Sequence, residues 1–182
     1  MKRVLVPLAP GFEEIEALTI IDILRRGELI VVTASLGDTA VEAAHGVTVM
    51  ADKTLDQALQ DTYDMVVLPG GMPGASNLNE DPRVHEILRK MADSGKFAGA
   101  ICAAPIVLAK AGLLKGKKVT SYPGFIDKMN LPDTTYTGGP VECDGKVVTG
   151  RSPGTAMDFA LTLVGLLQGK ETRDKVEAGL VR

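Results

Sequence analysis

The residue with the clearest chemical potential is Cys102, because it stands between a predicted strand and a predicted helix. The segment Ala98-Gly99-Ala100-Ile101-Cys102-Ala103-Ala104-Pro105 ends the strand at the cysteine and begins the helix at once. Small neighbours permit a sharp turn there, as in a nucleophile elbow, and a helix N-terminus lowers the pKa of a thiol. We therefore predict a reactive thiol at Cys102; a buried structural cysteine is the alternative.

The other cysteine and the two histidines lack such a context. Cys143 precedes an Asp-Gly turn and is predicted to be structural. His45 lies in a predicted hairpin turn and His85 on a helix face that looks solvated, so we expect both at the surface. Such scattered residues predict no metal site, and we expect no organic cofactor. If Cys102 acts, the expected partner is a carboxyl group rather than an imidazole.

That partner is predicted to be Glu16. Together with Glu13 and Glu14 it opens the first predicted helix, where acids complement the helix dipole. On the helical wheel, however, Glu16 falls between Ile20 and Ile23, on the apolar stripe. We expect this carboxyl to be at least partly buried. Burial raises the pKa of a carboxyl group and can keep it protonated, as a hydrogen-bond donor.

A glycine-rich segment, Leu68-Pro69-Gly70-Gly71-Met72-Pro73-Gly74, follows another buried strand. Glycines let the backbone approach a ligand and expose its amide groups. Gly70 and Gly71 could therefore form part of an oxyanion hole, or simply an ordinary turn from strand to loop. A phosphate-binding loop is not predicted, because the Lys-Ser/Thr ending is absent.

The segments around Glu16, Gly70 and Cys102 can form one site only if the fold brings the ends of several strands together. Short apolar strands that alternate with helices predict such a fold. We predict strands at 4–6, 29–34, 65–68, 97–101 and 119–121, a hairpin over 41–51, short strands within 134–149, and helices at 13–26, 54–60, 82–94, 103–111, 155–167 and 171–180. The pattern is typical of an α/β protein with a parallel sheet covered on both faces. Ligands of such folds bind beyond the carboxyl ends of the strands.

Composition limits the classes of protein that fit. The chain has 182 residues, a formal net charge of −3 and 45% hydrophobic residues. We expect one domain spanning 1–182. The slightly acidic balance predicts no nucleic-acid binding. No run approaches the ~20 apolar residues that span a bilayer, and no signal-peptide pattern is evident. We therefore expect a soluble cytoplasmic protein that does not bind membranes.

The sequence resembles the ThiJ/PfpI superfamily, and most of all the branch with bacterial YajL and the Parkinson-linked protein deglycase. Four motifs carry the resemblance over the whole chain: Gly11-Phe12-Glu13-Glu14-Ile15-Glu16, Leu68-Pro69-Gly70-Gly71, Ala100-Ile101-Cys102-Ala103-Ala104-Pro105 and Pro153-Gly154-Thr155-Ala156. The resemblance implies a flavodoxin-like three-layer sandwich with a mostly parallel central sheet, and a homodimer. It also implies deglycase or glyoxalase activity on methylglyoxal, glyoxal or their adducts, or a redox-responsive chaperone.

For the site, the resemblance implies that Cys102 is the nucleophile or oxidation-sensitive thiol. Glu16 would be the protonated carboxyl group that hydrogen-bonds its sulfur. Backbone amides around Gly70, Gly71 and Ala103 would line an oxyanion pocket.

Two departures from the superfamily pattern narrow the expected function. Protease-like members carry His directly after the cysteine, where this chain has Ala103, and this argues against a peptidase. Some members of the deglycase branch place His where this chain has Tyr122. Tyr122 is expected either to donate a hydrogen bond to a substrate oxygen or to form the pocket wall.

Three hypotheses follow. The first is a cofactor-independent enzyme of carbonyl and oxidative stress, in which Cys102 attacks a small reactive carbonyl or a glycated protein side chain and Glu16 moves the proton. The second is a non-catalytic redox sensor or chaperone whose Cys102 is oxidised to a sulfinate. The third is a PfpI-type peptidase, which would need a histidine from across a subunit interface.

Overall fold

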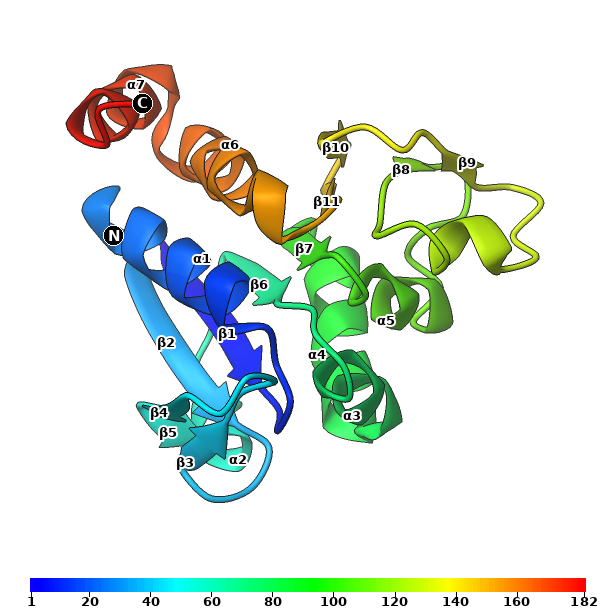
Figure 1. Cartoon of the computed structure of the whole chain (residues 1–182), viewed down its shortest axis with the longest axis horizontal. Coiled ribbons are helices and arrows are strands. Elements are labelled where there is room, and N and C mark those ends of the chain that lie inside the picture. The colour runs from blue at the N-terminus through cyan, green and yellow to red at the C-terminus, as the bar shows by residue number, and fades with distance from the viewer.

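A computed structural model describes all 182 residues. Its centre is a seven-stranded sheet in the order β10-β11-β7-β6-β1-β2-β5 (Figure 1). Neighbouring strands run parallel except for the antiparallel pair β10 and β11. The strands are β1 (Arg3–Leu8), β2 (Ile30–Ser35), β5 (Lys53–Thr54), β6 (Met65–Leu68), β7 (Phe97–Ile101), β10 (Val141–Asp144) and β11 (Val147–Gly150).

Alternation along the strands explains the two faces of this sheet. Val4, Val6 and Leu8 of β1 belong to one buried apolar cluster, whereas Leu5 of the same strand belongs to the other. Strand β6 alternates between the two clusters in the same way. A strand that is buried on both faces needs helices on both faces. The predicted α/β class and mostly parallel sheet are therefore confirmed.

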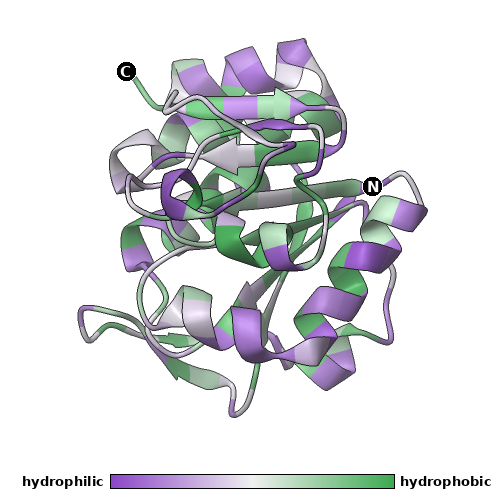
Figure 2. Ribbon diagram, turned by 90° about the vertical axis from the view of Figure 1, so that its right-hand side faces the viewer, coloured by the Kyte–Doolittle hydropathy of each residue, from purple (hydrophilic) through white to green (hydrophobic).

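The helices form the two outer layers. The layer over one face contains α1 (Glu14–Arg26), α6 (Ala156–Gln168) and α7 (Lys170–Gly179). The layer over the other face contains α2 (Leu55–Ala58), α3 (Gly74–Glu80), α4 (Pro82–Asp93) and α5 (Pro105–Lys110). Figure 2 shows hydrophobic residues concentrated in the interior and hydrophilic stretches on the outer helices. No helix is both long enough and apolar enough to cross a membrane.

Smaller elements complete the chain. The predicted hairpin exists as β3 (Ala40–Glu42) and β4 (Thr48–Met50). The strand expected at 119–121 is shorter, β8 (Lys118–Val119), and pairs with β9 (Thr135–Tyr136) outside the central sheet. Two 3-10 helices, η1 (Ile126–Lys128) and η2 (Pro153–Thr155), precede β9 and α6.

The prediction of an exposed His85 was wrong. Its side chain is buried, and its Nε2 lies 2.8 Å from the carbonyl oxygen of Asn79. Asn79 belongs to α3, a helix that the glycine- and asparagine-rich sequence does not predict. Because α3 covers that side of α4, a position that looks solvated on the isolated helix becomes interior.

Candidate active site

Three neighbouring strands of the central sheet, β1, β6 and β7, bring the candidate residues together. Glu16 lies in the first turn of α1, which follows β1, and Gly70 follows β6. Cys102 directly follows β7. The carboxyl ends of parallel strands meet at one edge of a sheet, so three segments that are far apart in the sequence meet there.

Cys102 occupies a strained backbone turn. Its φ is 63°, in the left-handed region that side-chain-bearing residues rarely adopt. Hydrogen bonds hold the turn on both sides: the Cys102 amide donates to Gly150 over 3.0 Å, and its carbonyl oxygen accepts from the Tyr122 amide over 2.9 Å. The sharp turn predicted after this strand is therefore present, and the side chain is 9% exposed. The helix that follows begins at Pro105 instead of at Ala103.

Glu16 is fully buried, as its position on the apolar stripe predicted. Its Oε2 accepts a hydrogen bond of 2.7 Å from the Gly70 amide, whereas Oε1 has no hydrogen-bond partner. The pKa of this carboxyl group is raised from 4.5 to about 7, mainly by burial, with a smaller contribution from the charge of Glu13. Interactions with the Cys102 thiol and the Gly70 amide act in the opposite direction. Near neutral pH, Glu16 can therefore hold or release a proton.

Gly70 lies between the acid and the cysteine. A Cβ atom at this position would stand 2.7 Å from Cys102 Cβ and 2.7 Å from Glu16 Oε2. Real Cβ atoms do not approach other atoms so closely, so this close approach of three segments requires glycine. The sequence suggested Gly70 as an oxyanion donor, but its amide is already bonded to Glu16.

Two other backbone amides interact with the thiol. Hydrogen bonds from Ala103 and Gly71 lower the pKa of the Cys102 thiol. Gly71 has a φ of 89°, and a Cβ there would lie 2.3 Å from the Glu13 nitrogen, so this turn also requires glycine. These amides favour the ionised thiol, so they, rather than that of Gly70, are the candidates to stabilise negative charge there.

The expectation of a lowered thiol pKa is not met. Burial raises the pKa of the Cys102 thiol, and the charge of the neighbouring Glu16 raises it further. A carboxylate and a thiolate that interact directly repel each other, so the two groups titrate as a coupled pair. Protonation of Glu16 removes that repulsion, and a protonated carboxyl group is a donor to sulfur.

Tyr122 is placed next to Cys102 by its backbone, through the amide hydrogen bond to the Cys102 carbonyl oxygen. Its ring is 46% exposed and packs edge-on against Phe125, with ring centroids 6.4 Å apart. The tyrosine hydroxyl makes no hydrogen bond within the chain. Tyr122 was expected either to donate a hydrogen bond to a substrate oxygen or to form part of the pocket wall. This packing favours the second role.

A contact that sequence reasoning missed joins α1 to the β3–β4 hairpin. His45 donates its amide to Glu14 Oε1 over 2.8 Å, and its Nδ1 lies 3.0 Å from Glu14 Oε2 and 3.7 Å from Glu13 Oε2. Ligand atoms of these three residues lie within 4.8 Å of one another, as in a metal site. The imidazole, however, already pairs with Glu14, so we assign the cluster to ion pairing. The partners are 31 residues apart, so no local pattern could reveal them.

A protein-family model described as the DJ-1/PfpI family matches residues 2–166. This match covers most of the chain and includes Glu16, Gly70 and Cys102. The chain belongs to the DJ-1/PfpI family. The resemblance that the sequence motifs suggested is thereby confirmed.

Individual relatives agree. The Parkinson disease protein 7 homolog of Danio rerio is 42% identical over 183 residues, covering 99% of this chain and 97% of that protein. The glutathione-independent glyoxalase DJR-1.2 of Caenorhabditis elegans is 37% identical, covering 93% and 91%. The crystal structure of Drosophila melanogaster DJ-1beta superposes with a TM-score of 0.94 at 41% identity, covering 99% and 97%. The chain spans less than half the length of two Arabidopsis thaliana relatives, the DJ-1 homologs A and B.

Proposed function

We propose that this protein is a cysteine-dependent enzyme of the glyoxalase or deglycase type that acts on methylglyoxal, glyoxal or their adducts. Cys102 is the nucleophile and Glu16 is its proton-transfer partner. The observation that carries the proposal is a fully buried carboxyl group whose pKa is raised to about 7, with one oxygen unpartnered, interacting with a thiol on a strained turn. General acid–base groups work best when their pKa lies near the working pH.

The first step is addition of the thiol to the aldehyde. The sulfur of Cys102 bonds to the aldehyde carbon, the π electrons move to the carbonyl oxygen, and that oxygen takes up the proton, giving a hemithioacetal. The amides of Gly71 and Ala103, which favour the ionised thiol, stabilise the negative charge that develops on the oxygen.

The second step is rearrangement and release. Ionised Glu16 removes the proton from the former aldehyde carbon and returns a proton to the neighbouring carbon, which converts the hemithioacetal into a thioester of the hydroxy acid. Water then hydrolyses the thioester and frees Cys102, so that methylglyoxal and one water give lactate. No metal and no external thiol take part. The Caenorhabditis elegans relative that is called a glutathione-independent glyoxalase supports this chemistry.

The test is lactate formation from methylglyoxal with purified protein. We expect Cys102→Ser to lose at least about a thousandfold in kcat/KM, and Glu16→Gln at least about a hundredfold. Cys143→Ser is the matched control, because Cys143 is exposed, and it should keep full activity. Full turnover in Cys102→Ser would overturn the proposed mechanism. A parallel assay with a glycated model peptide separates deglycase from glyoxalase activity.

A redox role of the same thiol is the second candidate function. Thiolate and two equivalents of hydrogen peroxide give a sulfinate and two waters. A Glu16 that holds its proton near neutral pH could donate it to a sulfinate oxygen. Mass spectrometry after mild peroxide treatment should find sulfinate at Cys102 and not at Cys143. Equal oxidation of Cys102 and Cys143 would argue against a redox role of Cys102. A peptidase is disfavoured, since neither His45 nor His85 hydrogen-bonds to Cys102.

We also propose that two copies of the chain form a homodimer. Exposed apolar side chains gather on α1 and on the hairpin that His45 ties to it: Ile15, Leu18, Val47 and Met50. Exposed apolar surface on two elements that are joined to each other favours burial of that surface against a second copy of the chain. Sedimentation analysis should show a dimer, and Leu18→Glu should shift it toward the monomer. A monomeric wild-type protein would contradict this proposal.

A further inference from the structure

A cavity of about 430 Å³ lies at the end of the sheet opposite Cys102. Its lining comes from the beginnings of β1, β6, β7 and β11 and from the end of α6. Phe97 begins β7 and Cys102 follows its end, so at about 3.3 Å per residue the two lie roughly 17 Å apart. The cavity is therefore separate from the candidate active site.

Three lysines and a single carboxylate line this cavity. Lys2 and Lys96 both donate to the same oxygen of Asp64, over 3.2 Å and 2.9 Å. The other oxygen of Asp64 accepts from the Arg3 amide over 2.9 Å. Although burial raises the pKa of Asp64, these hydrogen bonds hold it at about 2, so the carboxylate is fully ionised and its oxygens are occupied.

The third lysine, Lys146, has no carboxylate partner. Its Nζ lies 4.0 Å from the centre of the Phe97 ring, a cation–π contact that fixes the ammonium group at the cavity wall. An ammonium group has three donors, so Lys2 and Lys96 each keep two beyond the bond to Asp64, and Lys146 keeps all three. The lining thus carries two positive charges in excess, and most of its donors are unmatched.

The rest of the lining indicates the chemical character of a ligand. Leu166 and Leu167 of α6 and the ring of Phe97 supply an apolar side, and Ser94 at the end of α4 adds a hydroxyl group. A dianion would neutralise the excess charge of the lysines. An organic group attached to that dianion would rest on the apolar side.

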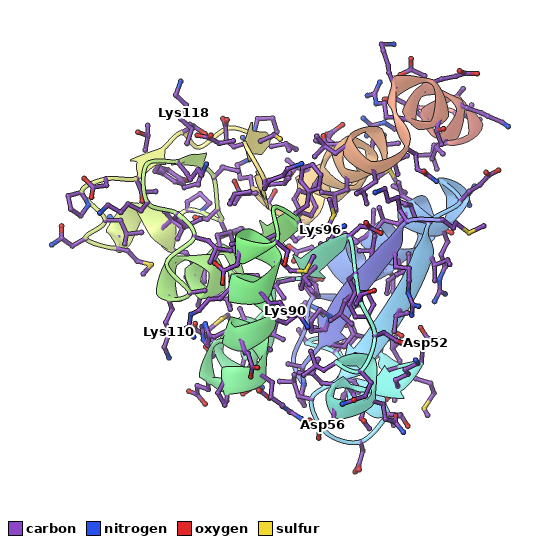
Figure 3. The ribbon with its side chains drawn as sticks, turned by 180° about the vertical axis from the view of Figure 1, so that it is seen from behind. Asp52, Asp56, Lys90, Lys96, Lys110 and Lys118 are labelled. Carbon is purple, nitrogen blue, oxygen red and sulfur yellow. The ribbon has the colours of Figure 1, made fainter.

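We propose that this cavity binds a small phosphate monoester, with its phosphate between Lys2, Lys96 and Lys146 and its organic group against Phe97 and Leu167. Figure 3 shows where Lys96 lies, beside strands of the central sheet. A phosphate monoester and free inorganic phosphate both present a phosphate dianion, so either could occupy the position between the lysines. Comparison of the two as probes distinguishes them.

The experiment is calorimetric titration of the full chain with phenyl phosphate and with inorganic phosphate at an ionic strength of about 0.1 M, where charges more than about 10 Å apart are screened. We expect saturable binding with a Kd on the order of 1 mM or tighter, and stronger binding of phenyl phosphate. Lys146→Gln should weaken both by about tenfold or more, because a charged hydrogen-bond donor is lost. Lys146 has no ion pair to lose, so thermal unfolding of Lys146→Gln should show only the small decrease expected from loss of the cation–π contact with Phe97.

Lys118→Gln is the matched control, since it removes the same charge from an exposed lysine on β8 that does not line the cavity (Figure 3). It should leave both affinities within about twofold. Absence of saturable binding, or an equal loss in Lys118→Gln and Lys146→Gln, would overturn the proposal. Equal affinities for phenyl phosphate and inorganic phosphate would show that the organic group contributes nothing to binding, which would overturn that part of the proposal. Lactate formation by Lys146→Gln should be unchanged, so this test is independent of the proposed enzyme activity.

Discussion

The Gly70 amide donates a hydrogen bond of 2.7 Å to Glu16 Oε2, and this contact joins the first turn of α1 to the end of β6. It fixes one carboxyl oxygen and leaves the other, Oε1, free of hydrogen bonds. One backbone group thus orients the acid toward the thiol without neutralising it. A side-chain cation in the same place would hold Glu16 ionised and abolish its capacity to carry a proton near neutral pH.

Gly70→Ala is expected to disrupt the site and destabilise the fold. Its Cβ would meet Cys102 Cβ and Glu16 Oε2, both at 2.7 Å, and overpacking of this kind costs about 1–3 kcal/mol. Urea unfolding and lactate formation measure the two effects. Gly37→Ala is the control, because no atom lies within 4 Å of its Cβ position. Wild-type activity in Gly70→Ala would show that the three segments do not need this close approach.

Glu16→Gln should change how stability depends on pH. Glu16 has a pKa of about 7 in the folded protein and 4.5 ordinarily, so between these values the folded state binds more protons than the unfolded state. Its contribution is full below pH 4.5, falls as the pH rises, and is lost above about 7, a loss of about 3 kcal/mol. Urea unfolding at several pH values should show this loss in the wild type and not in Glu16→Gln. If the free energy of unfolding depended on pH in the same way in both proteins, the raised pKa of Glu16 would be contradicted.

His45 should titrate above its ordinary pKa of 6.5. The hydrogen bond to Glu14 and the charges of Glu14 and Glu13 favour the protonated ring. The stabilisation is fully present below pH 6.5 and is lost as the pH rises through the folded-state pKa. NMR titration of the ring should give a raised value that returns toward 6.5 in Glu14→Gln. An unchanged value in that variant would remove Glu14 as the cause.

Tyr122 can be tested by separating its hydroxyl from its ring. Because the hydroxyl makes no hydrogen bond and the ring packs against Phe125, we expect Tyr122→Phe to keep kcat/KM within about twofold. Tyr122→Ala removes the wall and should raise KM for methylglyoxal. A large loss of kcat in Tyr122→Phe would instead assign the hydroxyl a hydrogen bond to substrate.

Local patterns were sufficient for several parts of the site. The helical wheel placed Glu16 on the buried stripe, and it is fully buried. The strand-to-helix junction predicted the turn at Cys102, where the φ is 63°. Alternation of apolar strands and helices predicted the sheet with helices on both faces. The first two properties depend on neighbours within about one or two helical turns, and the third on the hydrophobic period of each segment, so the sequence itself contains all three.

Other properties depend on which segments pack together, and there the sequence was insufficient or misleading. His85 looked exposed until α3 covered it, and the thiol of Cys102 was expected to have a lowered pKa until burial and Glu16 raised it. The assignment of the Gly70 amide to Glu16 and the meeting of Lys96 and Lys146 at one cavity both follow from the order of strands in the sheet. Strand order brings together residues that are distant in the chain, and burial, hydrogen bonding and charge coupling arise from that proximity, so no local window of sequence contains them.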